Sequence, residues 1–436
     1  MTDEDRGSPE SHDPPPETEP VTAAAAAQAE RAIAPEIMAD SLGQYVRAAL
    51  NRVRAGESGV LPVVAGLVLI SALFQSLNSH FLTAGNIVNL LIQGAVYMLL
   101  AMGEVYALLL GEIDLSIGFV SGIGGIVTAE LVKQSLDWPW WAAIVVALLA
   151  CAAIGAIQGT IITRLGLPSF VVTLAGLLGW QGVGLLILGK GGSLPINNKV
   201  VNDFASGNLT PIASWIVMLA VVGLFGLRMW LRDARRRGSG LVAPPASVTL
   251  VKIAASAVAG IVVVLICNTN RGTLVTIRGL PWVVLIVLGV LTMWTLLLGR
   301  TKFGRYMYAI GGNPEAARRA GVNLAAIRTM AFTLASFTAG IAGIVYASRL
   351  RSVSTSLDGG TLVLYSVAAA VIGGTSLFGG RGKAVHAVLG GLVIAAIDNG
   401  MGLQGYSGAA QKVVTALVLL SAVTIDAIAH RGRSAR

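Results

Sequence analysis

Long apolar segments follow one another along most of the chain, separated by short polar ones. From about residue 59 onward, most of these segments approach the roughly 20 residues that an α-helix needs to cross the hydrocarbon core of a bilayer. We therefore predict an all-α, polytopic transmembrane helical bundle of 10 to 12 spans. The twelve predicted spans are residues 59–77, 86–110, 113–133, 139–163, 166–189, 212–231, 248–268, 281–299, 329–349, 361–378, 384–402 and 410–428.

The composition and the placement of charge agree with a membrane protein. Hydrophobic residues make up 55% of the chain and charged residues only 12%, against about 25% charged residues in a typical soluble domain. A net charge of +9 would suggest nucleic-acid binding in a soluble protein. Here most basic residues fall in segments at the predicted cytoplasmic face, which is the bias that sets orientation in a membrane. We predict cytoplasmic termini, a plasma (inner) membrane location in contact with lipid, and no nucleic-acid partner.

The two ends of the chain differ from the apolar middle. Residues 1–36 combine seven acidic residues before Val21 with runs of proline and alanine, which favours a disordered cytoplasmic tail. Residues 37–55 carry apolar positions at helical spacing among arginines, which predicts an interfacial amphipathic helix, with a simple loop as the alternative. Residues 56–430 form the predicted transmembrane domain, and residues 431–436 form a basic cytoplasmic tail.

A polar, basic segment at residues 300–328 separates two long apolar segments. Within it, Asn313 can cap a helix, Pro314 suits the first helical position, and Glu315 complements the positive end of the helix dipole. Gly321 then supplies a stop signal. These signals predict a helix of about two turns that has no core of its own. We interpret it as a surface that another protein grips.

Two carboxylates and a hydroxyl, from Glu112, Asp114 and Ser116, lie between two apolar segments. Charge at membrane depth is costly and usually functional, so these residues could belong to a broken helix that lines a transport path. The alternative is a cytoplasmic turn in which Asp114 or Ser116 caps the next helix. The sequence leaves both interpretations open.

Two further polar groups interrupt the late spans. Gly374 and Thr375 begin a glycine-rich run at residues 373–383, which is either a kinked or re-entrant segment or a flexible turn. Asp398 and Asn399 lie inside a later apolar segment and either line a cavity near the outer face or end a helix. Both pairs are candidates for the translocation path.

The chain contains no recognisable energy-supplying or catalytic site. Gly184 and Lys190 have the spacing of a phosphate-binding loop, but Gly191 stands where the motif needs a hydroxyl for magnesium. The four histidines are scattered, and Cys151 and Cys267 lie far apart in apolar segments. We therefore expect no ATPase activity, no catalytic residue, no metal and no cofactor in this chain.

The residues around the polar segment resemble a known family. Glu315, Ala316 and Ala317, followed at the right interval by Gly321, resemble the coupling loop of ABC importer permeases. Similarity to the monosaccharide branch of that family extends over most of residues 60–428 and is clearest at residues 112–118, 168–176, 303–305, 308–313 and 372–377. The resemblance implies that Asn313, Glu315, Ala316, Ala317, Arg318 and Gly321 contact an ATPase.

Within that branch the chain looks most like the D-xylose type. The extra pair of spans at residues 212–268, the turn at residues 270–272 and the segment at residues 398–401 carry this likeness. The acidic tail and residues 404–407 depart from it, so ribose, galactose or a nucleoside stays an alternative substrate. An ion-coupled secondary transporter, with acidic residues such as Glu104 or Asp398 as ion sites, is the rival class.

The resemblance also implies an assembly and a mechanism. Members of the family are homodimeric or pseudo-dimeric permeases that work with two cytoplasmic ATP-binding subunits and an extracytoplasmic sugar-binding protein. We expect alternating access, in which closure of the ATP-binding subunits moves the short helix and the bundle opens the sugar path.

Overall fold

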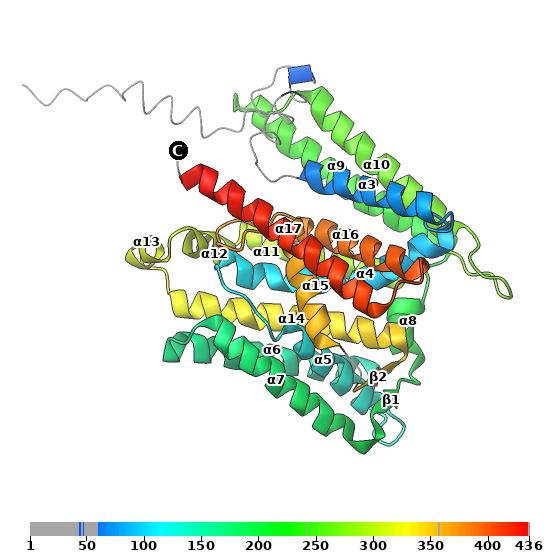
Figure 1. The fold of residues 1–436 in the computed structure, drawn as a ribbon. Coiled ribbons are helices and arrows are strands. Elements are labelled where there is room, and N and C mark those ends of the chain that lie inside the picture. The colour runs from blue at the N-terminus through cyan, green and yellow to red at the C-terminus, as the bar shows by residue number, and fades with distance from the viewer. Residues whose placement is uncertain (1–42, 45–46, 48–59, 242, 356–357, 435–436) are drawn as a thin grey trace, which may run out of the picture. The chain divides into compact units, whose positions relative to one another are not determined.

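The computed structural model describes residues 43–44, 47, 60–241, 243–355 and 358–434 (Figure 1). The predicted tail at residues 1–36 and nearly all of the predicted amphipathic helix at residues 37–55 lie outside the described residues. Of the basic tail at residues 431–436, only the backbone up to residue 434 is described. The chain divides into two compact units, one made of Met1–Arg52 with Gly223–Ser256 and the other of Val53–Val222 with Ala257–Arg436.

The larger unit is almost entirely helical. Its helices are α3 (Val60–Leu77), α4 (Ala84–Leu109), α5 (Ile117–Val132), α6 (Trp140–Leu165), α7 (Ser169–Leu188), α8 (Lys199–Ser206), α11 (Trp282–Arg300), α12 (Lys302–Gly312), α13 (Pro314–Arg319), α14 (Leu324–Leu350), α15 (Gly359–Ile372), α16 (Ala384–Leu403) and α17 (Gly408–Ser434). A 3₁₀ turn at Gly189–Gly191 follows α7. The all-α prediction did not include one small sheet, in which β1 (Ser193–Pro195) pairs antiparallel with β2 (Ser352–Ser354) in the register Ser193↔Ser354.

Two more long helices, α9 (Pro211–Gly238) and α10 (Ala246–Asn268), run from one unit into the other. Within the smaller unit they form the two sides of a hairpin. Buried Asp233 accepts a hydrogen bond from Thr249 Oγ1 at 3.0 Å and pairs with Arg232 at 2.9 Å. Arg237 donates to the carbonyl of Pro244 and lies over the ring of Trp230. These contacts join the end of α9 to the start of α10.

The described residues contain eight helices that are long and apolar enough to cross a membrane, namely α4, α6, α7, α9, α10, α11, α14 and α16. Four shorter apolar helices lie at Leu61–Leu77, Ile117–Val132, Gly359–Ile372 and Gly408–Ser421. Each predicted span overlaps one of these twelve helices. The prediction of a polytopic helical bundle is therefore confirmed, because apolar length is the property that both the sequence pattern and the structure report.

Proline and glycine set several helix boundaries. Gly166 ends α6 in the left-handed conformation, with a φ of 65°, and Pro168 then precedes the first turn of α7. The tenth predicted span ran to residue 378, but α15 ends at Ile372. The reason is that Gly374 adopts a φ of 96° and the glycine-rich run continues as an irregular turn.

Helix α4 forms the centre of the larger unit. Its residues from Gly94 to Leu109 are all buried, and it packs against α14, α16 and α15 (Figure 1). Glycines allow close approaches between neighbouring helices. A Cβ atom on Gly155 of α6 would lie 2.3 Å from the carbonyl oxygen of Phe332 in α14. Such contacts hold helices together where lipid gives no hydrophobic drive for association.

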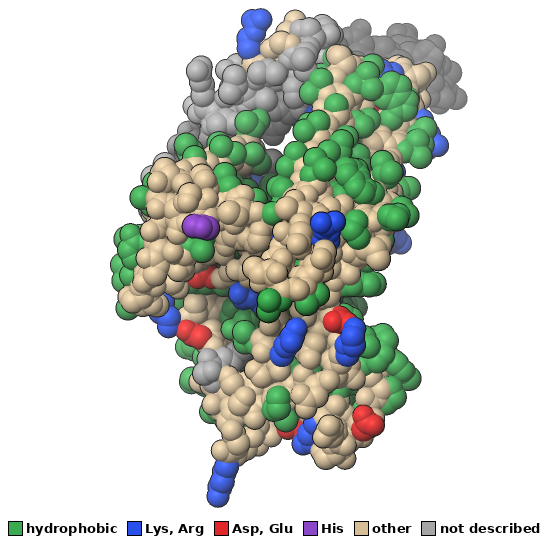
Figure 2. Space-filling model, turned by 90° about the vertical axis from the view of Figure 1, so that its right-hand side faces the viewer, with side chains coloured by type: hydrophobic (Ala, Val, Ile, Leu, Met, Phe, Trp, Pro, Cys, Tyr) green, Lys and Arg blue, Asp and Glu red, His purple; other side chains and the backbone are tan. Residues whose placement is uncertain are grey.

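Exposed side chains on the bundle are largely apolar. Leu186 of α7 is 82% exposed and Leu69 of α3 is 70% exposed, as expected for lipid-facing positions. The face in Figure 2 also carries charged side chains of both signs, interspersed among neutral ones.

Candidate functional site

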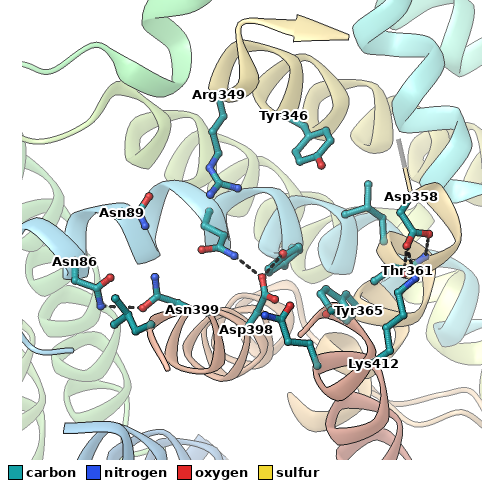
Figure 3. Close-up of a pocket in the computed structure, with 17 residues that line it drawn as sticks. Asn86, Asn89, Tyr346, Arg349, Asp358, Thr361, Tyr365, Asp398, Asn399 and Lys412 are labelled. Carbon is teal, nitrogen blue, oxygen red and sulfur yellow. Dashed lines mark hydrogen bonds and ion pairs between the residues drawn. The ribbon is translucent and has the colours of Figure 1, made fainter. Parts of the chain in front are cut away.

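A polar cavity of about 540 Å³ lies in the larger unit among α4, α14, α15, α16 and α17 (Figure 3). Its lining combines amides, phenols and charged groups with only two aliphatic side chains, Leu362 and Leu403. The polar and charged lining residues are Asn86, Asn89, Gln93, Tyr97, Tyr346, Arg349, Asp358, Thr361, Tyr365, Asp398, Asn399, Gln411 and Lys412. Such a surface can form hydrogen bonds with a small polar solute.

The predicted pair Asp398 and Asn399 lies at this cavity, on the side of α16 that faces α4. Asp398 Oδ2 accepts a hydrogen bond from the hydroxyl of Tyr97 at 2.7 Å and another from the amide of Gln93. The amide of Asn86 donates to Asn399 Oδ1 at 2.8 Å. Helix α16 continues past both residues to Leu403, so they line the cavity from within a helix.

An ion pair between Asp358 and Lys412 forms another part of the cavity lining. Asp358 caps α15 by accepting a hydrogen bond from the backbone N–H of Thr361 at 3.0 Å, and its Oδ2 lies 2.8 Å from Lys412 Nζ. Burial alone would raise the pKa of Asp358, but the ammonium of Lys412 and the Thr361 hydrogen bonds outweigh it and lower that pKa. Asp358 is therefore held ionised beside the cavity.

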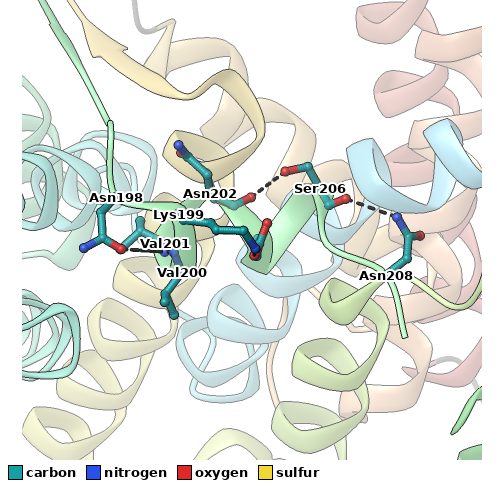
Figure 4. Close-up of polar contacts among 9 residues, drawn as sticks. Asn198, Lys199, Val200, Val201, Asn202, Ser206 and Asn208 are labelled. Carbon is teal, nitrogen blue, oxygen red and sulfur yellow. Dashed lines mark hydrogen bonds and ion pairs between the residues drawn. The ribbon is translucent and has the colours of Figure 1, made fainter. Parts of the chain in front are cut away.

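The end of α14 that reaches the cavity is fixed by the short helix α8, whose N-cap residue Asn198 is drawn in Figure 4. Asn198 caps α8, because its Oδ1 accepts from the backbone N–H groups of Val200 and Val201. Ser348 of α14 donates to the carbonyl of Asn202 at 3.0 Å and accepts from the N–H of Ala205 at 2.9 Å. These bonds position the turn of α14 that carries the lining residues Tyr346 and Arg349.

The predicted group of Glu112, Asp114 and Ser116 lies in the irregular connection between α4 and α5, away from the cavity lining. Asp114 is fully buried, and its Oδ1 accepts from the N–H of Ser116 at 2.9 Å and from its hydroxyl at 2.6 Å. Glu112 pairs with Arg328 of α14 at 3.0 Å. Asp114 thus bonds to Ser116, the N-cap residue of α5, whose own side chain makes no capping hydrogen bond, and both the capping role and the role in the transport path stay predictions.

The glycine-rich run that contains Gly374 and Thr375 packs against α12 and does not line the cavity. The hydroxyl of Tyr308 in α12 donates to the carbonyl of Gly382 at 2.7 Å. The N–H of Gly380 donates to the carbonyl of Leu109, the last residue of α4, at 2.9 Å. The run therefore joins α12 to the end of α4.

The predicted short helix is present as α13, although we did not predict that α12 would precede it. Asn313 caps α13 by accepting from the N–H of Ala316 at 2.9 Å, and Gly321 follows it with a φ of 80°. Glu315 pairs with Arg318 at 2.9 Å and with Arg319 at 3.0 Å. Ala317 alone in α13 is buried, so the helix presents most of its surface to solvent.

We did not predict the cavity residues contributed by α4. Asn86, Asn89, Gln93 and Tyr97 recur at three- and four-residue intervals, which is the spacing of one face of a helix. That polar stripe within an apolar segment was a usable signal. Among the described residues, no group of three or more His, Cys, Asp and Glu side chains could hold a metal ion.

These features define a membrane transport subunit, and comparison with known proteins specifies its class. The chain belongs to the family described as the permease component of branched-chain amino acid transport systems, whose model matches residues 86–423. It is the permease subunit of an ABC importer, a multi-pass protein of the cytoplasmic membrane, and not an ATPase. The family implies partner ATPase and binding-protein subunits.

Relatives that align over nearly their whole length are named as sugar transport proteins. The xylose transport system permease protein of Escherichia coli strain K12 is 33% identical over 375 residues, which cover 85% of this chain and 92% of that protein. The protein of the same name from Haemophilus influenzae is 34% identical, covering 84% and 95%. The ribose import permease protein of Escherichia coli strain K12 is 30% identical, covering 84% and 92%. No solved structure matches the chain significantly.

Proposed function

We propose that this permease carries a monosaccharide into the cell, with xylose as the first candidate, driven by ATP hydrolysis on partner subunits. The observation that carries the proposal is the polar cavity in which Asp398 is held between Tyr97 and Gln93. Relatives that match most of the chain are named for xylose and ribose transport, which supports a sugar as the solute.

The size and lining of the cavity suit a sugar. Its volume of about 540 Å³ lies within the roughly 300–1,000 Å³ typical of small-molecule sites. Amide and phenol groups supply both donors and acceptors for the hydroxyls of a sugar. A branched-chain amino acid would need an apolar recess for its side chain, and the lining provides only two aliphatic residues. The lining therefore favours a monosaccharide over the solute in the family description.

The formal charges around the cavity cancel. Arg349 and Lys412 contribute two positive charges, and Asp358 and Asp398 contribute two negative ones. A site without net charge gives no long-range attraction to an anionic or cationic solute. This balance is a second reason to favour a neutral substrate.

Helix α14 supplies a direct mechanical connection between the coupling helix and the cavity. It begins at Leu324, shortly after α13 ends at Arg319, and runs for 27 residues to the turn that carries Tyr346 and Arg349. At 1.5 Å per residue it is about 40 Å long, enough to cross the bilayer. Displacement of α13 by an ATP-binding subunit would move the cavity end of the same helix.

The topology that accompanies this proposal has twelve spans, both termini in the cytoplasm and α13 on the cytoplasmic side. The cavity then opens toward the outer side, where a sugar-binding protein would deliver its cargo. Glu112, Asp114, Ser116, Gly374 and Thr375 lie nearer the cytoplasmic end, where they would act at the exit of the path. We propose a homodimer, with residues 300–328 of each copy facing one ATP-binding subunit.

The identity of the solute is testable by competition. Permease reconstituted with its cognate binding protein and ATP-binding subunits is supplied with labelled xylose, together with excess unlabelled xylose, ribose, galactose or a nucleoside. We expect xylose to compete most strongly. Stronger competition by another solute would transfer the assignment to that solute, and strong competition by leucine or valine would overturn the sugar assignment.

A further inference from the structure

A second buried polar cluster lies farther along α4 than the cavity. Glu104 is seven residues, or about 10 Å, beyond Tyr97. Glu104 and Asp114 both have 0% exposure. Glu104 Oε1 accepts a hydrogen bond from the backbone N–H of Asp114 at 3.2 Å, so the two carboxyl-bearing residues are in direct contact.

Three atoms of this cluster are enclosed without a partner. They are Glu104 Oε2, Asp114 Oδ2 and Gln158 Nε2. Gln158 comes from α6, is 3% exposed, and is aimed into the cluster, because its Oε1 lies 3.0 Å from the hydroxyl oxygen of Ser116, whose one proton is donated to the nearer Asp114 Oδ1. Buried polar atoms in native proteins are rarely left unsatisfied, so the enclosed oxygens of Glu104 and Asp114 need a hydrogen-bond donor.

The cluster also lacks a compensating cation among the described residues. Arg328 of α14, which reaches the connection between α4 and α5, is paired with Glu112 at 3.0 Å. Helix α7, which packs against α5 and α6, has no ionisable side chain. The helices that pack against α4 and α5 carry other ionisable groups, and none of these forms an ion pair with Glu104 or Asp114 among the described residues. They are Tyr106 of α4, Glu130 of α5, Cys151 and Arg164 of α6, Arg300 of α11, Lys302, Arg305, Tyr306 and Tyr308 of α12, Arg349 and Tyr346 of α14, Tyr365 of α15, and His386 and Asp398 of α16.

Two adjacent carboxylates in such an enclosed site cannot both remain ionised at modest cost. We propose that Glu104 and Asp114 form a binding site for a single proton, which is carried by Glu104. Asp114 is the better stabilised anion of the two, because its Oδ1 accepts two hydrogen bonds from Ser116 and it lies at the N-terminus of α5. Glu104 accepts only one backbone hydrogen bond and has less to stabilise an anion.

The chemistry of the site favours a proton over a metal ion. A hard cation such as Ca²⁺ takes 6–8 oxygen ligands. Here Asp114 Oδ1 already accepts two hydrogen bonds, and the free atom of Gln158 is a donor nitrogen that a cation would avoid. A proton instead converts Glu104 into a hydrogen-bond donor and removes one of the two negative charges.

The bound proton stabilises the packing of α4 against the connection and α6. In the unfolded chain the carboxyl of Glu104 is ionised at neutral pH, like that of any exposed glutamate. At neutral pH the folded form therefore binds one proton more than the unfolded form. The folded state is therefore favoured at low pH, and this contribution is lost as the pH rises past the point at which Glu104 releases its proton in the folded protein.

Infrared spectroscopy of the full-length permease in lipid nanodiscs tests the site. We expect the wild type to show the carbonyl stretching band of a protonated carboxylic acid at neutral pH. Glu104→Gln should remove that band, whereas the matched control Glu112→Gln should leave it unchanged. In parallel, the thermal midpoint of the wild type should fall as the pH rises, and that of Glu104→Gln should depend less on pH.

Two results overturn the proposal. The first is a wild-type spectrum without the protonated-carboxyl band, and the second is a band that persists unchanged in a folded Glu104→Gln variant. If that variant does not fold, wild-type permease with ¹³C-labelled glutamate carboxyls decides the question. A band that shifts with the label and persists in Glu112→Gln supports the assignment to Glu104, and an unshifted band contradicts it.

Discussion

The guanidinium of Arg328 lies 3.0 Å from the carboxylate of Glu112 and joins the first turns of α14 to the connection between α4 and α5. The side chains are 31% and 11% exposed, so water screens the pair only partly. Arg328 comes nine residues after Arg319, the end of the proposed coupling helix. The pair therefore links α14, the helix that follows α13, to the connection at the end of the central helix α4.

Breaking this pair from one side should destabilise the permease. Glu112→Gln or Arg328→Gln alone leaves a partly buried charge without its partner, and we expect a loss of about 1–3 kcal/mol in unfolding free energy. The double variant should lose less than the sum of the two single variants. Thermal unfolding in nanodiscs measures all three, and strictly additive losses would show that the two groups do not interact.

A methyl group at Gly311 should disrupt the junction between α12 and α4. A Cβ atom there would lie 1.8 Å from the carbonyl oxygen of Leu109 and 2.4 Å from the N–H of Gly380, and neither backbone group can turn aside. We expect Gly311→Ala to lower the free energy of unfolding by about 1–3 kcal/mol. Gly312→Ala is the matched control, because nothing lies within 4 Å of its added atom. Equal unfolding midpoints for the two variants would contradict this packing.

Removing one hydroxyl from the cavity should weaken transport without unfolding the protein. Tyr97→Phe deletes the 2.7 Å hydrogen bond to Asp398, and a hydrogen bond to a charged group is worth about 1.5–3 kcal/mol. We expect uptake efficiency to fall about tenfold. Tyr406→Phe, at an exposed position outside the cavity lining, should transport like the wild type. Normal uptake by a folded Tyr97→Phe variant would exclude this bond from the path.

Helix α13, the proposed coupling helix, should keep its ion pairs under acidic conditions. Hydrogen bonds from Arg318 and then Arg319 lower the pKa of Glu315. Because that pKa is depressed, the stabilising contribution is complete above the ordinary glutamate value and disappears as the pH falls through the lowered value. A carboxyl ¹³C NMR titration, with Glu315 assigned by its loss in Glu315→Gln, measures the shift. Arg318→Gln should move the titration upward, and an ordinary pKa in the wild type would contradict the pairing.

Local sequence signals predicted the long apolar helices and the short helix α13 well. Apolar length located the spans, and the cap at Asn313 and the stop at Gly321 appear in the structure as expected. These features depend on residues only a few positions apart, so periodicity and capping preferences can reveal them.

The cavity could not be derived in the same way, because its contacts join distant parts of the chain. Asp398 meets Tyr97 across 301 positions, and Asn399 meets Asn86 across 313. The pairing of β1 with β2 depends likewise on where α7 and α14 end. Two polar stripes in separate apolar segments can be read from the sequence, but only the packing of α16 on α4 shows that they face one cavity.

The most direct test of the whole account is uptake of labelled xylose by proteoliposomes that contain the permease with its ATP-binding subunits and binding protein. We predict uptake that requires ATP on the cytoplasmic side and all partner subunits. Xylose accumulation by the permease alone, driven by an imposed proton or sodium gradient without ATP, would contradict the account and identify an ion-coupled transporter instead.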